Sequence, residues 1–71
     1  MNEIIFLNEE ALGGGYTAKA IGEDIFTEGH TLEEIKRNIK EAVECHFEDD
    51  KRPKLIRLRL IKEEVITDEI F

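Results

Sequence analysis

A helix start signal near the middle of the 71-residue chain limits the fold more than any other feature of the sequence. The segment Thr31-Leu32-Glu33-Glu34 has the pattern of a capping box, in which the threonine hydroxyl accepts a hydrogen bond from the Glu34 amide and the Glu34 carboxylate reaches back. One helical face downstream consists of Leu32, Ile35, Ile39, Ala42, Val43 and His46. Acids at 48–50 oppose the helix dipole and Pro53 forbids continuation, so the sequence predicts one helix from residue 31 to residues 47–50.

Four short segments have the pattern of β-strands, and these are residues 4–7, 16–21, 25–28 and 55–62. The first is a continuous apolar run, which is typical of a strand buried on both sides or at its centre. Glycines at 13–15 supply the positive φ angles of a hairpin between the first two segments. Residues 22–24 form the next turn, and Gly29 closes the third strand.

Two of these segments alternate in the way that half-buried strands do. Tyr16, Ala18 and Ala20 share one face, and the small side chains there let a helix lie close. In the fourth segment the residues expected to face the core are Ile56, Leu58 and Leu60, with Arg57 and Arg59 on the opposite face.

The order strand, strand, strand, helix, strand predicts an α+β domain in which a four-stranded sheet is covered on one face by one helix. If the first three strands form a meander, a right-handed helical crossover places the fourth beside the first, and the sheet order is 3-2-1-4. One helix leaves the other sheet face partly bare, and a chain this short buries only about 60% of its unfolded surface. We therefore expect a homo-oligomer, either a dimer or a tetramer.

Charge narrows the class of partner. The formal net charge of −7 repels phosphate backbones, so we expect no direct binding of nucleic acid. Residues 1–30 hold six acids against one base, a net charge of −5, whereas residues 31–71 hold eleven acids against nine bases, a net charge of −2. An acidic first half suits a basic protein partner, because complementary fields steer the encounter.

Several short motifs occur in an order that resembles the HicB antitoxin family, whose domains open with a glycine-rich hairpin and have a helix that begins at a threonine. The matching residues are Gly14-Gly15-Tyr16, Thr27-Glu28-Gly29, Thr31-Leu32-Glu33-Glu34 and the apolar positions Ile39, Ala42 and Val43. The resemblance implies a HicB-like domain over residues 1–62, a reduced relative of the RNase H fold, followed by a C-terminal tail, 63–71. It also implies a partner, a small basic ribonuclease toxin of the HicA type.

Two departures from that family concern the loop before the third strand and the region after the domain. Members often carry a D-L-P-G-C-like segment where this chain has the shorter Ile21-Gly22-Glu23-Asp24-Ile25. Many also append a DNA-binding domain, for which this chain has no room. We therefore expect a stand-alone domain that does not repress transcription by itself.

No set of residues has the pattern of a catalytic, metal or cofactor site. An RNase H-like nuclease needs a carboxylate on its first strand to help hold divalent metal, and residues 4–7 contain none. Glu23 and Asp24 are adjacent turn acids, which are most often simply solvated. Cys45 and His46 are neighbours in a helix and point about 100° apart, so they cannot act as nucleophile and base. We expect no enzyme activity, no cofactor and no metal.

Localisation follows from what the sequence lacks. Its start has no basic flank of a signal peptide, and no apolar run approaches the ~20 residues of a membrane span. Cys45 has no second cysteine with which to form an internal disulfide, which fits a reducing compartment. We expect a cytoplasmic protein that does not bind membranes.

Two segments stay open to more than one interpretation. The basic stretch 51–62 is either a contact surface for RNA phosphates or for an acidic surface of another subunit, or a solvated face of the sheet. The solvated face is favoured, because the stretch contains no aromatic residues for stacking on single-stranded bases. The tail either packs back on its own sheet or serves as a partner-binding arm.

The most favoured function is that of an antitoxin-like protein that neutralises a HicA-type toxin. The candidate partner-binding residues are Glu23, Asp24, Glu63, Glu64, Val65, Ile66, Asp68, Ile70 and Phe71. The alternative is a HicB-fold accessory or ligand-binding subunit that has no toxin partner.

Overall fold

The computed structural model describes residues 2–62 and residue 66 of the chain, and all statements below concern these residues. The elements are β1 (Glu3–Glu10), β2 (Tyr16–Ala20), β3 (Phe26–Gly29), α1 (Leu32–His46) and β4 (Leu55–Ile61). Their order confirms the predicted succession of three strands, one helix and a fourth strand. The strand bounds differ most for β1, which continues beyond the apolar run at both ends.

The four strands form one mixed sheet in the order β3-β2-β1-β4, as predicted. β1 lies in the middle, antiparallel to β2 and parallel to β4. Phe6 is aligned with Ala20 on one neighbour and with Leu58 on the other, so the centre of the sheet presents apolar side chains on the face below the helix. Glu3–Glu10 is therefore an interior strand, and the side chains on its second face are half-buried or exposed rather than buried.

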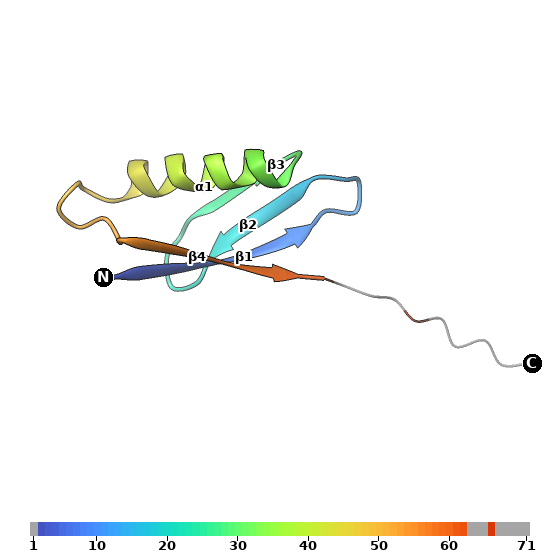
Figure 1. Ribbon diagram of the computed structural model, residues 1–71, viewed down its shortest axis with the longest axis horizontal. Helices are drawn as coiled ribbons and strands as arrows, with labels where there is room; N and C mark the ends of the chain where they lie inside the picture. Colours follow the sequence, from blue (N-terminus) through green and yellow to red (C-terminus); the bar gives the residue numbers. More distant parts are fainter. Residues whose placement is uncertain (1, 63–65, 67–71) are drawn as a thin grey trace, which may run out of the picture.

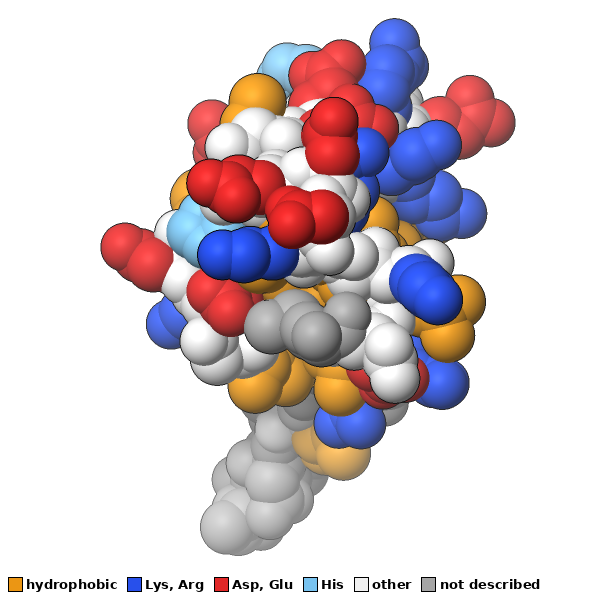
Figure 2. Space-filling model, turned by 90° about the vertical axis from the view of Figure 1, so that its left-hand side faces the viewer, with side chains coloured by type: hydrophobic (Ala, Val, Ile, Leu, Met, Phe, Trp, Pro, Cys, Tyr) orange, Lys and Arg blue, Asp and Glu red, His pale blue; other side chains and the backbone are white. Residues whose placement is uncertain are grey.

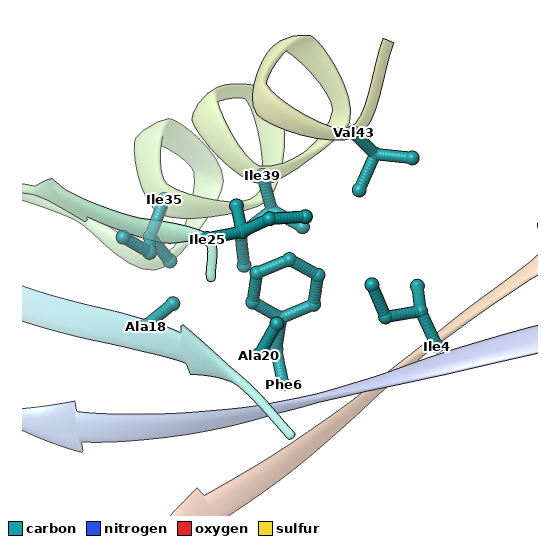
Figure 3. Packing of buried hydrophobic residues seen from close by; sticks show 8 residues of the cluster. All are labelled: Ile4, Phe6, Ala18, Ala20, Ile25, Ile35, Ile39 and Val43. Atoms are coloured by element: carbon teal, nitrogen blue, oxygen red, sulfur yellow. The ribbon is translucent and has the colours of Figure 1, made fainter. Parts of the chain in front are cut away.

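The helix lies on one face of this sheet, closest to β3 and β2 (Figure 1). Its buried side chains, Ile35, Ile39 and Val43, point down onto the sheet (Figure 3). Phe6 lies in the middle of the cluster and is fully buried. The small residues Ala18 and Ala20 on β2 let the helix approach, and both are buried, as the alternation predicted.

Two glycines are required by the backbone. Gly15 has a φ of 82° and closes the β1–β2 hairpin, where its carbonyl accepts from the Ala11 amide at 3.0 Å. Gly29 ends β3 directly below the helix, and a Cβ built there would lie 2.9 Å from the backbone nitrogen of Ile35. The close contact between β3 and α1 therefore depends on a residue without a side chain.

Both ends of the helix agree with the prediction. The Thr31 hydroxyl accepts a hydrogen bond from the Glu34 amide at 3.0 Å, and Thr31 has the extended backbone of an N-cap. The C-cap is Phe47, whose amide donates to the carbonyl of Val43 at 3.1 Å. The amides of Lys54 and Leu55 both donate to the carbonyl of Asn2 and so join the start of β4 to the start of β1.

One core prediction is wrong. Leu60 is on the helix side of β4, yet it is 66% exposed, whereas Ile56 and Leu58 on the same side are half-buried and pack against the core. The physical reason is the position of the helix, which covers β2 and β3 and leaves the far end of β4 open.

The sheet face opposite the helix is uncovered, as a one-helix fold predicts. Phe26 on β3 is 63% exposed, and Leu55 and Ile61 on β4 are also exposed. In the described part of the chain, no helix is long and apolar enough to cross a membrane.

Candidate functional site

The acidic turn between β2 and β3 contains two of the predicted partner-binding residues. Asp24 is exposed, and Glu23 is half-buried. Ile25 at the end of the turn is buried in the core, and its carbonyl accepts from the amide of Ala20 at 3.0 Å. The turn is therefore attached to the core at its base, while its carboxylates lie at the surface.

Glu23 has a partner that the sequence pattern did not reveal. Its Oε2 lies 3.3 Å from Nε2 of His46, which is 23 positions later in the last turn of α1. The His46 ring also packs edge-on against Phe47, with ring centroids 4.9 Å apart. The contact is a hydrogen bond, and it becomes an ion pair when the imidazole is protonated. It holds the acidic turn against the C-terminal end of the helix.

All but one of the other predicted partner-binding residues fall in the part of the chain that the structure does not describe. Glu63, Glu64, Val65, Asp68, Ile70 and Phe71 lie outside the described residues. Ile66 is described and is 86% exposed, so it does not pack on the domain of its own chain. Of the three predicted residues that are described, the structure brings together Glu23 and Asp24.

A second feature, a basic groove between α1 and the start of β4, was missed as a unit in the sequence. It has a volume of about 370 Å³. Its basic residues are Lys36 and Lys40 on the helix and Arg52 and Lys54 before β4, with one acid, Glu44. The sequence signal was present in two halves, because Lys36 and Lys40 are one turn apart and the basic stretch begins at residue 51.

The floor of this basic groove is apolar. Val43 from the helix and Ile56 and Leu58 from β4 line it, together with Pro53. Figure 2 views this end of the molecule and shows Lys and Arg side chains gathered along one flank, with hydrophobic side chains between them. An occupant that combines negative charge with apolar side chains would match both features of the groove.

Arg52 in the groove wall is only partly paired. Its Nη2 donates to Asp49 at 2.8 Å, and its buried Nε has no acceptor among residues 2–62 and 66. Glu48 and Lys51 also approach each other, at 4.0 Å. Glu48 and Asp49 therefore have basic neighbours in the same loop, and both are exposed at the surface.

A smaller pocket of about 210 Å³ lies between the start of the helix and the end of β4. Asn8, Tyr16, Leu32 and Leu60 are among its lining residues. Asn8 is 1% exposed, and neither its amide nitrogen nor its amide oxygen has a partner among the described residues. A buried primary amide without hydrogen bonds is unfavourable, so this position is a weak point of the core or a place for a polar occupant.

The bounds of β1 correct one step of the sequence interpretation. The first strand was expected to carry no acid, but it includes Glu3, Glu9 and Glu10 because it is longer than its apolar run. Glu3 accepts from Nε of Arg57 on β4 at 3.1 Å. In the described residues, no three His, Cys, Asp or Glu side chains are grouped in a way that could hold a metal ion.

Cys45 and His46 are also separated in their surroundings. Cys45 is an exposed free thiol, whereas His46 contacts Glu23.

Comparison with known proteins places the chain in a family. A UPF0150 protein of Archaeoglobus fulgidus is 58% identical over 52 residues, which are 73% of this chain and 77% of that protein. A UPF0150 protein of Thermotoga maritima is 44% identical over 64 residues, which are 90% of each chain. No protein-family model matches the chain, and no solved structure matches it. On the strength of these two relatives, the chain belongs to the UPF0150 protein family.

Proposed function

We propose that this protein is a HicB-like antitoxin that binds a small basic HicA-type ribonuclease and neutralises it by covering its surface. The observation that carries the proposal is the acidic turn at Glu23 and Asp24, which the His46 contact holds at the surface of a chain with a net charge of −7. The HicB-like motifs support it. Gly15 closes the hairpin and Thr31 caps the helix, so these motifs have structural roles in the fold.

The proposed binding has an approach step and a holding step. The excess of acids in residues 1–30 attracts a basic partner over long range, which raises the rate of encounter. Apolar side chains of residues 63–71 then stabilise the complex, because charge at the exposed rim of an interface adds little to affinity once the complex has formed. Exposed Ile66 is one of these side chains.

The proposed role of this chain is binding and involves no reaction of its own. A toxin that cleaves RNA is neutralised when a protein covers its active site, and the antitoxin then needs no catalytic group. We place this action in the cytoplasm, where a free thiol such as Cys45 persists.

Co-expression tests the proposal. A HicA-like protein encoded beside this chain is expected to co-purify with it, and the complex is expected to cleave RNA more slowly than the free toxin. Glu23→Lys/Asp24→Lys should slow association by about tenfold, because it reverses the field at the turn. Glu33→Lys/Glu41→Lys makes the same charge change on the outer face of α1 and serves as the matched control. Absence of a complex together with unchanged RNA cleavage would overturn the proposal.

A second candidate function is that of an accessory or ligand-binding subunit with no toxin partner. The unpaired amide of Asn8 beside a pocket of about 210 Å³ favours it, because a small ligand with both a donor and an acceptor would complement that amide. The neighbouring reading frame separates the two candidates. A short, basic, histidine-bearing frame favours the antitoxin, whereas a metabolic operon favours the ligand-binding subunit.

A further inference from the structure

The basic groove and the tail of this chain have opposite charge and matching apolar content. The groove combines Lys36, Lys40, Arg52 and Lys54 with the single acid Glu44, a net charge of +3. Residues 63–71 hold four acids and no base, with apolar residues between the acids. We propose that residues 63–71 of one copy occupy the basic groove of a second copy, in a two-fold dimer that exchanges its tails.

Charge and apolar surface act together in this groove. Carboxylates that reach the groove meet two lysines on α1 and two basic residues before β4, so each would have a cation nearby. Arg52 has a buried Nε without an acceptor among the described residues, and an entering carboxylate would supply one. The apolar tail residues meet Val43, Ile56 and Leu58 on the floor. The backbone of a nucleic acid would complement the basic side chains but would make no use of the apolar floor.

The direction of β4 favours occupation of the groove by the tail of a second copy rather than by the tail of the same chain. The groove adjoins Pro53 and Lys54 at the start of β4, whereas the tail begins after Lys62 at the other end of the strand. The two ends of β4 are about 20 Å apart, because a strand rises about 3.3 Å per residue. The tail would have to reverse and run back along β4 to reach its own groove, and the described residue Ile66 is 86% exposed rather than packed there.

The free edge of the sheet supplies a suitable arrangement. β4 is an edge strand, paired with β1 on one side only, and such edges pair readily between copies. If two β4 edges run antiparallel, the strand of each copy points toward the start of the other. The residues after Lys62 of one copy then pass Pro53 and Lys54 of the second, at the mouth of its groove. This dimer forms without a toxin, so it does not rest on the proposed antitoxin function. Because both interactions use residues 63–71, a toxin held by the tail would displace it from the groove of the second copy.

Charge reversal on each side distinguishes tail exchange between copies from assembly through a different surface. The groove variant Lys36→Glu/Lys40→Glu places acidic tails against an acidic groove. The tail variant Glu63→Lys/Glu64→Lys/Asp68→Lys/Glu69→Lys changes the net charge of the tail from −4 to +4 and places basic tails against a basic groove. Each variant alone should dimerise at least about tenfold more weakly than the wild type, measured as the dissociation constant by sedimentation equilibrium at low salt. Their mixture should form a heterodimer, because both groove–tail pairs in it are complementary.

Matched controls keep the test specific. Lys19→Glu/Arg37→Glu makes the same charge change as the groove variant on residues that do not line the groove, and it should leave the dimer intact. Circular dichroism of each variant checks that the fold is retained. A wild-type chain that is monomeric at about 100 μM would overturn the proposal, since specific dimers form well below that concentration.

Three further outcomes would also overturn it. An assembly that survives in both reversal variants is held by another surface. A mixture that does not form a heterodimer shows that each tail binds its own chain or none. Loss of single-stranded RNA binding in the groove variant, with the dimer unchanged in the tail variant, assigns the groove to nucleic acid.

Discussion

Nε2 of His46 lies 3.3 Å from Oε2 of Glu23 and joins the last turn of α1 to the turn between β2 and β3. Both side chains are partly exposed, at 37% and 26%, so solvent weakens the interaction. Its main consequence is geometric. It links the acidic turn, which Ile25 anchors in the core, to the C-terminal end of the helix at the surface.

A double-mutant cycle measures this contact. Glu23→Gln and His46→Gln should each cost little, with a coupling free energy of about 0.5 kcal/mol, because both groups remain partly solvated. Urea unfolding followed by circular dichroism gives the four free energies of unfolding. A coupling indistinguishable from zero would show that the two side chains do not interact in solution.

Asn8 provides a sharper test of the core. Asn8→Leu replaces a buried, unpaired amide with an apolar side chain of similar size, and it should leave the free energy of unfolding unchanged or raise it by about 1–2 kcal/mol. Asn8→Asp should lower it, because it buries a charge without a partner. Guanidinium unfolding measures both. Destabilisation by Asn8→Leu beyond about 1 kcal/mol would mean that the amide has a hydrogen-bond partner in solution, such as a buried water.

Two glycines form a matched pair for testing the contact between β3 and α1. Gly29→Ala should destabilise the domain by about 1–3 kcal/mol, since the new methyl group would meet the helix backbone at Ile35. Gly13→Ala has open space around the new Cβ and should change stability by no more than about 0.5 kcal/mol. Thermal unfolding of the two variants compares them directly. Equal stabilities would contradict the close approach of β3 and α1.

The capping hydroxyl can be tested in the same way. Thr31→Ala removes the acceptor for the Glu34 amide and should lower the free energy of unfolding by about 1 kcal/mol. Thr31→Ser keeps the hydroxyl and should retain most of that free energy. If serine and alanine are equally destabilising, the hydroxyl makes no contribution and the threonine acts through its methyl group.

Much of the fold could be predicted because the relevant interactions are local. The Thr31 cap and the glycine hairpin each depend on residues a few positions apart, and both occur as predicted. The alternation of Ala18 and Ala20 correctly identified the face below the helix. The sheet order followed from chain direction and from the preference for a helical crossover.

The candidate site was predicted less well, because its residues meet only through the packing of separate elements. Sequence spacing identified Glu23 and Asp24 as a turn but could not place His46 beside them, since 23 positions separate Glu23 from His46. It likewise separated Lys36 and Lys40 from Arg52 and Lys54, which the structure brings to one groove. Leu60 was misassigned because alternation shows the side of a strand and gives no information on how far a helix extends over it.

The sequence by itself determined the local elements of this protein, namely the capped helix, the glycine hairpin and the alternating strands, because these depend on hydrogen bonds and side-chain spacing within a few residues. Only the tertiary structure decided which surfaces those elements create together. The helix lies over β2 and β3 because Ala18, Ala20 and Gly29 let it approach there. That choice leaves β4 at an open edge and forms the basic groove beside it.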